Sequence, residues 1–306
     1  MRVDVYLPLI TSLLLGLSAS RLARWLPPAT ATRALLAAGL AAAVSTLYAL
    51  ALLAWTLAAE IPLVASLGGW SFLAWARLDP VAPPVAALAA LGLVVCGVRL
   101  ATAIRRHRLS YAAVARLGRE LAGSAEGPLV VVPSDSPEAF ALPYGRGLVV
   151  VSSGMLAALS PAECGVLLAH EHAHLAHRHH RYRALAGFAA SVNPLLGSLP
   201  RAVRFATERW ADEEAATITA DRALAARALA RAALAGLASP AREGLAYHSC
   251  DVSDRVSSLL RPIPRRRPLL VVALAALICV TLWAPVDANA DSDTLLNSAC
   301  TASCDV

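Results

Sequence analysis

The chain has 306 residues, of which 58% are hydrophobic and only 16% charged, and its mean hydropathy is +0.59. This composition excludes an ordinary soluble globular protein and favours an integral membrane protein. The net charge of +6 does not indicate direct nucleic-acid binding, because the basic residues form no patch interleaved with aromatic side chains. We therefore expect the lipid bilayer as one partner, and no nucleic acid.

Four apolar runs have about the length that a helix needs to cross a hydrocarbon core, roughly 17 to 25 residues. They cover about residues 5–20, 34–59, 81–103 and 268–285, so residues 1–104 are predicted to hold three transmembrane helices and residues 268–285 the fourth. The first run also resembles a cleaved signal peptide, since GLSAS offers small residues at a cleavage point. Arg21 and Arg24 follow this run instead of preceding it, which favours a retained helix.

The distribution of arginines predicts the orientation of these helices. Arginines gather after the first run, after the third run and before the fourth, at Arg21, Arg24, Arg33, Arg105, Arg106, Arg108, Arg261, Arg265, Arg266 and Arg267. Because positive charge is retained on the cytoplasmic side of a membrane, these connections are expected in the cytoplasm. We predict a multi-pass protein of the cell membrane, with extracytoplasmic termini, a short extracytoplasmic tail over residues 286–306, and residues 105–267 in the cytoplasm.

Residues 105–267 form the longest stretch between the apolar runs. Residues 128–133 have a strand pattern, and residues 140–152 have the pattern of a hairpin that turns at residues 144–147. The pattern then becomes helical, because Ser160 suits an N-cap, Pro161 the first helical position and Glu163 a capping box. The predicted fold is mainly α, with four transmembrane helices and a cytoplasmic α+β domain inserted between the third and the fourth.

The predicted helix carries the sequence His-Glu-His-Ala-His over residues 170–174. His170 and His174 are four residues apart, so a helix places both imidazoles on one face, close enough to bind one metal ion. Glu171 lies about 100° round the helix from His170, where its carboxylate reaches a metal-bound water. This H-E-x-x-H pattern predicts a metal site with a general base.

Six of the eight histidines lie between His170 and His180, and four of them do not fit this metal site. His172 points to the opposite side of the helix, and His177 lies about 10 Å further along it. His179 and His180 are expected in a solvated, basic helix end.

Downstream acidic residues supply candidates for a third ligand. Glu208 and Asp212 are four residues apart, so a helix places both carboxylates on one face. We expect Glu208 to bind the metal and Asp212 to accept a hydrogen bond from the free N–H of a ligand histidine. Glu213 and Glu214 are the alternatives, and a solvated acidic face is the other interpretation of the cluster.

The segments HEHAH and ERWAD resemble the zinc helix and the E-x-x-x-D element of gluzincin membrane peptidases, families M48 and M56. The segment SPEAFALPYGRGLVVVSSGMLAAL is similar to the strand and turn that these families place before the zinc helix. Four helices with the metal domain between the third and fourth look most like family M56, the peptidases of beta-lactam sensor-transducers, over residues 1–285. The chain departs from them after the last helix, where about twenty polar residues replace the penicillin-binding sensor domain.

The resemblance implies a gluzincin-type domain with one zinc ion (Zn²⁺) per chain. The segment HSCDVSDR, residues 248–255, resembles the later H-P-x-x-x-x-R element of the family, although it lacks the proline and is one residue longer. The resemblance implies that His248 stabilises the oxyanion, with an ordinary surface histidine as the alternative. Arg255 is expected to pair with a buried carboxylate.

The apolar residues 184–200 are nearly long enough to cross a membrane. A single crossing would put Glu208 and His170 on opposite sides and abolish the site. We therefore expect a helix–turn–helix that turns at Asn193 and Pro194, and that packs on the domain or the membrane surface, or dips and returns.

These observations predict a membrane zinc endopeptidase, in which zinc bound by His170, His174 and Glu208 activates water and Glu171 transfers the proton. An extended peptide substrate is expected to add as a strand at the edge formed by Ala139, Phe140, Ala141 and Leu142. The family suggests regulated proteolysis or signal transduction, by cleavage of a cytosolic transcriptional repressor or of a membrane protein. The alternative is a membrane metal sensor that uses the histidine cluster without hydrolysis.

Overall fold

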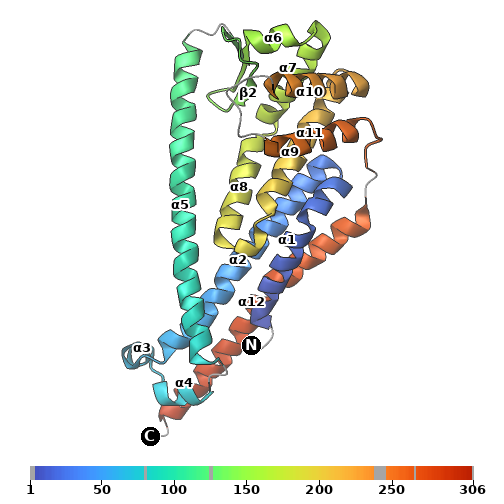
Figure 1. The fold of residues 1–306 in the computed structure, drawn as a ribbon. Helices are drawn as coiled ribbons and strands as arrows, with labels where there is room; N and C mark the ends of the chain where they lie inside the picture. The colour runs from blue at the N-terminus through green and yellow to red at the C-terminus, as the bar shows by residue number, and fades with distance from the viewer. Residues whose placement is uncertain (1–3, 79–80, 124–126, 238–245, 265–266, 305–306) are drawn as a thin grey trace.

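The computed structural model describes residues 4–78, 81–123, 127–237, 246–264 and 267–304 (Figure 1). Four of its helices are long and apolar enough to cross a membrane. They are α1 (Leu7–Trp25, preceded by the short 3-10 helix Asp4–Tyr6), α2 (Pro28–Ala59), α5 (Pro83–Ala122) and α12 (Pro268–Cys304). A mainly helical protein with four such helices and a small sheet is therefore confirmed, and α1 packs in the core with α2, α9 and α12.

Two of these helices extend beyond the predicted limits. Helix α5 continues to Ala122, because the residues after its apolar half are good helix formers such as Ala, Leu, Arg and Glu. Helix α12 continues through Pro285 to Cys304, so the described part of the expected tail is a helical extension. Pro285 lacks an N–H and so removes one hydrogen bond from this helix without ending it.

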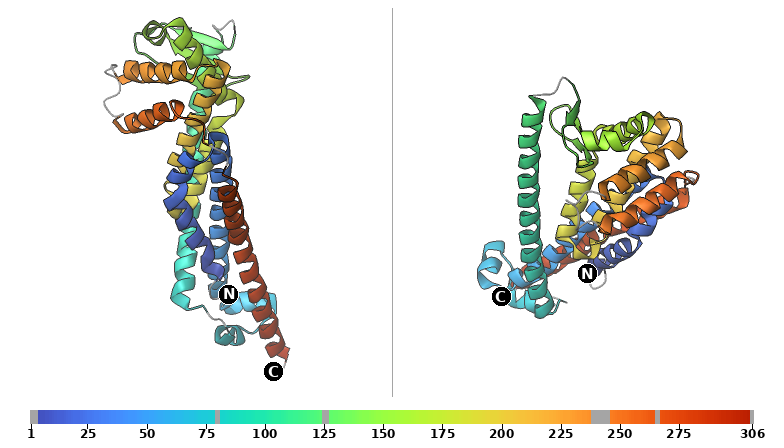
Figure 2. Two further views of the ribbon diagram at one scale, coloured as in Figure 1. Left: turned by 90° about the vertical axis from the view of Figure 1, so that its right-hand side faces the viewer. Right: turned by 45° about the horizontal axis from the view of Figure 1, so that its top comes forward.

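The long helices alternate in direction along the bundle. Its two ends carry different elements. The N- and C-termini lie at the same end as the short helices α3 (Pro62–Gly68) and α4 (Phe72–Leu78) (Figure 1). The sheet and helices α6 (Ser153–Ala158), α7 (Pro161–Ala176), α10 (Arg222–Leu237) and α11 (Ala246–Leu259) lie at the other end. Figure 2 shows α10 and α11 projecting to one side above the bundle.

The sheet has three strands in the order β1-β3-β2. The central strand β3 (Leu148–Ser152) is buried along its whole length, pairs parallel with β1 (Leu129–Val132) and pairs antiparallel with β2 (Ala139–Leu142). The predicted hairpin is confirmed, and Gly145 and Gly147 turn it with φ values of 59° and 97°. Among the described strands, β2 is therefore an edge strand.

Helix α7 begins as predicted and ends earlier than expected. Ser160 Oγ accepts from the N–H of Glu163, and Glu163 Oε2 accepts from the N–H of Ser160 at 3.0 Å, which completes the capping box. The helix ends at Ala176, and Arg178 adopts a left-handed conformation with φ of 53°. The chain therefore changes direction before α8 (His179–Val192), and the expectation that His179 and His180 lie at the end of this same helix is wrong.

Residues 184–200 form a helical hairpin that dips between the long helices. Helix α8 leads to a short 3-10 helix (Pro194–Leu196) and then to α9 (Leu199–Ile218). Asn193 is 1% exposed at the tip, and its Nδ2 donates to Ser12 Oγ at 2.8 Å and Thr46 Oγ1 at 2.9 Å. The tip packs so closely on α1 that a side chain at Gly16 would collide with the Leu195 carbonyl. The turn at Asn193 is confirmed, and the hairpin packs against the long helices α1 and α2.

Candidate metal centre

Two histidines of α7 and a glutamate of α9 converge on one point. One ligand atom from each of His170, His174 and Glu208 lies within 4.8 Å of the other two. The two Nε2 atoms are 3.1 Å apart, and each is 3.6 Å from an oxygen of Glu208. Ligand atoms around a tetrahedral zinc ion, at bond lengths of about 2.0–2.2 Å, lie about 3.3–3.5 Å apart. The donor set therefore fits zinc.

The opposite ring nitrogens of both histidines are held by other side chains. His170 Nδ1 is 3.0 Å from Asp212 Oδ1, and His174 Nδ1 is 2.8 Å from His179 Nδ1. If each Nδ1 carries the proton of its ring, both Nε2 atoms turn lone pairs toward each other and toward the Glu208 carboxylate. Three lone pairs so close together repel one another unless a proton or a metal ion lies among them, so the arrangement favours positive charge at this point.

His179 is a residue of this site that the sequence analysis placed wrongly. It was expected in a solvated helix end, but it is 1% exposed and contacts the ring of His174. The cause is the left-handed residue Arg178, which starts α8 in a new direction and brings His179 back beneath α7. Spacing along one continuous helix cannot reveal this contact, because the helix break falls at a residue other than glycine.

Two arginines bind the carboxylates of the site. Arg255 Nε and Nη2 donate to the two oxygens of Asp212 at 2.8 and 2.7 Å, and its Nη1 lies 2.9 Å from Glu208 Oε2. Arg183 donates to the other Glu208 oxygen and, at 3.1 Å, to Thr207 Oγ1. The expected pairing of Arg255 with a buried carboxylate is confirmed, whereas Arg183 was not anticipated.

These contacts set the protonation of the site. Burial would raise the pKa of Glu208, but the charge of Arg255, the hydrogen bond with His170 and the charge of Arg183 hold this pKa well below its usual range. Burial would also raise the pKa of Asp212, but the charge and hydrogen bonds of Arg255 lower this pKa below its ordinary value. Glu171 differs, because burial raises its pKa and the nearby His170 and the Ala141 N–H offset only part of the rise. Glu171 is therefore the strongest base among the three carboxylates.

The histidines titrate in opposite directions in the metal-free protein. Burial alone would lower the pKa of His170, but hydrogen bonds with Asp212 and Glu208 raise this pKa to about 10. Burial lowers the pKa of His174, and likewise of His179, to about 3. A metal ion that binds at neutral pH therefore displaces a proton from His170.

These shifts predict a maximum of stability near pH 6.5 for the chelator-treated protein. The stabilisation from His170 is complete below its ordinary pKa of 6.5 and is lost as the pH rises through about 10. Because His174 and His179 have lowered pKa values, the unfolded chain binds more protons between about pH 3 and 6.5, and stability falls as the pH decreases. Thermal unfolding with chelator from pH 5 to 10 measures both slopes. The His170→Gln variant should lose the alkaline slope, and an unchanged slope would contradict the assignment.

Two cavities meet at the metal centre. One, of about 570 Å³, is lined by β2 residues together with His174 and Arg183. The other, of about 340 Å³, is lined in part by alanines and Leu229 of α10 and contains Arg255. His170, Glu171 and Glu208 line both cavities. The candidate centre therefore borders both cavities.

The remaining candidates from the sequence lie elsewhere. Glu213 pairs with Arg222, and Glu214 lies 3.6 Å from His177, so neither replaces Glu208. His172 is exposed, and His177 stacks on Trp210 with 4.5 Å between ring centroids. The side chain of His248 lies outside the described part of the structure.

The His170, His174 and Glu208 side chains form a candidate His-His-Glu metal site, such as a metallopeptidase uses. The model of Peptidase family M48 matches residues 105–264, slightly more than half of the chain, and the protein belongs to this family of zinc metallopeptidases. No curated protein and no solved structure matches the chain. The finer resemblance to family M56 stays a prediction.

Proposed function

We propose that the protein is a membrane-embedded zinc endopeptidase that cleaves peptide bonds with a metal-activated water. One observation carries this proposal: Glu171, a buried carboxylate with a raised pKa, lies beside the convergent His170, His174 and Glu208 in a chain of family M48. The test compares the parent with Glu171→Gln, because only the parent should cleave a peptide whereas both should bind zinc.

The residues of the site have separate roles in hydrolysis. Zinc bound by His170, His174 and Glu208 would supply a Lewis acid that acidifies water and polarises the scissile carbonyl. Glu171 accepts the proton of the attacking water and delivers it to the leaving amine, and its raised pKa suits both transfers. Asp212 and His179 orient the rings of the two histidines through Nδ1.

The edge of β2 offers the substrate a place to bind. The N–H of Ser152 donates to the Glu138 carbonyl at 2.9 Å, so the ladder alternation turns the backbone groups of Phe140 and Leu142 toward β3. The backbone groups of Ala139 and Ala141 then point away from β3, along the cavity that contains His174 and Glu171. An extended peptide that pairs with this edge would place a peptide bond next to Glu171.

An Ala141→Pro variant is expected to weaken peptide cleavage while zinc stays bound. Proline removes the N–H of Ala141, which also bonds the Glu171 carboxylate, and one lost backbone hydrogen bond is worth about 0.5–1.5 kcal/mol, or roughly a 2- to 10-fold fall in kcat/KM. Ala141→Ser is the matched control, since it keeps the N–H and should behave like the parent. Unchanged cleavage by Ala141→Pro would exclude substrate pairing at this edge.

We also propose that the catalytic end of the bundle faces the cytoplasm. The arginine-rich connections Arg21–Arg33, Arg105–Arg108 and Arg261–Arg267 support this orientation, and it places the termini outside the cell. The substrate would then be a cytosolic protein, such as a transcriptional repressor, or a membrane protein. Labelling of Cys300 in intact cells by a membrane-impermeant thiol reagent tests the orientation, and protection of Cys300 would reverse it.

A further inference from the structure

A cavity of about 370 Å³ lies away from the metal centre, where α1, α9, α11 and the connection to α12 meet. It shares no lining residue with the two cavities at the metal centre. Its charged lining consists of Arg24, Arg209 and Arg261 against a single carboxylate, Asp254, so these side chains carry a net charge of +2. This excess of positive charge favours an anionic ligand.

Arg209 distinguishes the cavity from a basic surface patch, because this arginine is buried. Its side chain is 3% exposed, and Nη1 donates to the carbonyls of Ala23 and Arg24, at 2.7 and 3.4 Å, at the end of α1. No carboxylate of the described residues pairs with Arg209, and its buried Nε has no hydrogen-bond partner there. A buried guanidinium with no ion pair and one unpaired N–H is costly, and Glu213 and Asp212 offset its charge only from longer range, so an anion in the cavity is expected to stabilise it.

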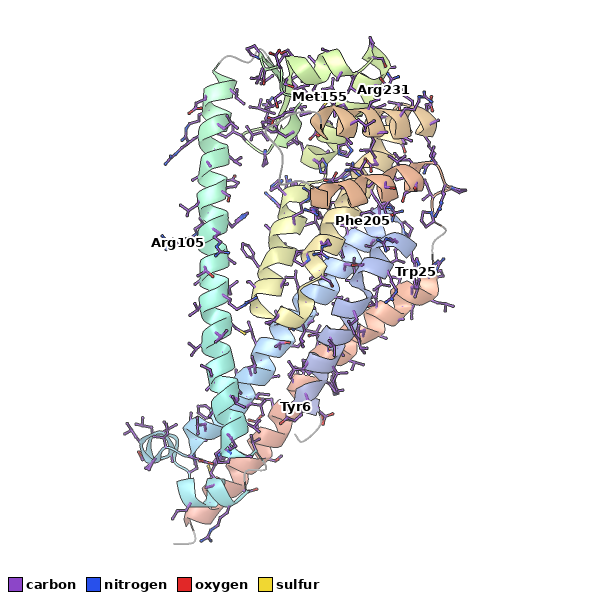
Figure 3. The ribbon with its side chains drawn as sticks, in the orientation of Figure 1. Tyr6, Trp25, Arg105, Met155, Phe205 and Arg231 are labelled. Carbon is purple, nitrogen blue, oxygen red and sulfur yellow. The ribbon has the colours of Figure 1, made fainter. Side chains whose placement is uncertain are left out.

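The level of the cavity in the bundle indicates the source of that anion. Trp25, which lines the cavity, ends α1, and Tyr6 immediately precedes its other end (Figure 3). Both aromatic side chains are exposed, as is typical of residues at membrane–water interfaces. Arg267, at the start of α12, lies with its guanidinium 5.7 Å from the Trp25 ring. Trp25 and the nearby arginines are the residue types expected at the level of lipid headgroups, on the arginine-rich side of the bundle.

We propose that this cavity binds a phosphate group and that an anionic phospholipid supplies it. Guanidinium groups bind phosphate oxygens with charge-assisted hydrogen bonds, and basic pockets between transmembrane helices bind lipid headgroups. Arg209 provides the buried contact, and Arg24 and Arg261, which are exposed, provide the outer contacts. Arg24 is already bonded to Asp254 at 2.9 Å, so the carboxylate competes with the phosphate for this arginine.

The proposal is tested with the full chain purified in detergent and titrated with phosphatidylglycerol or phosphatidylcholine, with bound lipid counted by native mass spectrometry. The parent should bind phosphatidylglycerol preferentially. Each arginine near a headgroup contributes about a five-fold change in affinity, so the Arg24→Gln/Arg261→Gln double variant should bind roughly 25-fold more weakly. Asp254→Asn removes the competing charge and should bind about five-fold more tightly.

The matched control is Arg105→Gln/Arg106→Gln, which removes two exposed arginines from α5 on the other side of the molecule (Figure 3). This control should bind phosphatidylglycerol like the parent. Equal losses in both double variants would show general surface attraction and overturn the proposal. Inorganic phosphate is titrated in a separate arm, and saturation by phosphate without any preference for phosphatidylglycerol would overturn the lipid source. If the Arg24→Gln/Arg261→Gln protein does not fold, the affinity of Asp254→Asn for phosphatidylglycerol decides the question. Tighter binding than in the parent would support the proposal, and equal or weaker binding would overturn it.

Discussion

Replacing Glu171 with glutamine is expected to abolish peptide hydrolysis while zinc remains bound. Glu171 is not one of the three convergent ligands, so the metal site keeps its donor set in this variant. The amide is nearly the same size as the carboxylate but cannot accept the proton of water. General acid–base catalysis typically contributes 10²- to 10⁴-fold, so the turnover of a fluorogenic peptide should fall by about this factor or more.

Two comparisons make this result specific. Glu214→Gln introduces the same chemical change in a residue that lies beside His177 instead of the metal centre, and it should cleave like the parent. His170→Ala should lose both cleavage and zinc, as measured by elemental analysis of the purified protein. A Glu171→Gln protein that cleaves peptide as fast as the parent would remove the hydrolytic role and favour the metal-sensor alternative.

The sequence predicted the parts of this site that depend on local pattern. The capping box at Ser160 and Glu163 and the four-residue spacing of His170 and His174 both follow from helix geometry, which local residues determine. The hairpin before the helix likewise follows from strand alternation interrupted by a glycine-containing turn. These features needed no knowledge of distant contacts.

Other features depend on contacts between distant segments, and the sequence did not reveal them. The turn at Asn193 was expected from the sequence, but the hydroxyl partners of its side chain on two long helices, Ser12 and Thr46, were not. The contact of His179 with His174 depends on a helix break at Arg178 that no local signal marks. The partners of Asn193 are remote in sequence, and the partner of His179 is brought close by an unexpected turn. Periodicity predicts neither kind of contact.

Replacing Arg255 with methionine is expected to destabilise the protein and to weaken zinc binding. The side chain of Arg255 is 10% exposed and bonds both oxygens of Asp212 as well as Glu208. Its removal leaves the 5% exposed carboxylate of Asp212 without its guanidinium, and breaking such a buried pair costs about 3–5 kcal/mol. Since Asp212 orients His170, zinc affinity should also fall about 10- to 100-fold. Chemical unfolding and zinc titration measure the two effects.

The Arg255→Met/Asp212→Asn double variant separates the pair from simple loss of packing. Removing both charges leaves only Glu208 without Arg255, and Glu208 keeps Arg183, so the double variant should lose less stability than the sum of the losses of the two single variants. Additive losses would mean that Arg255 acts through packing alone. Zinc affinity should not recover in the double variant, because the amide introduced at position 212 is a weaker acceptor for the His170 N–H than the carboxylate.

The pH dependence of the Arg255→Met defect supplies an independent check. In the parent, Arg255 lowers the pKa of Asp212 below its ordinary 3.8 and helps to hold that of Glu208 well below 4.5. Lowered carboxyl pKa values contribute stability above the unfolded values, and this contribution is lost as the pH falls through the folded ones. In the variant, burial is opposed only by the remaining partners, chiefly His170 for both carboxyls and Arg183 for Glu208, so both pKa values should rise and this contribution should be smaller at neutral pH. The stability difference between parent and variant should therefore be largest near pH 7 and shrink toward pH 4 and below, where the carboxyls no longer need the guanidinium. A difference that stays constant over this range would show that charge pairing is not the reason for the defect.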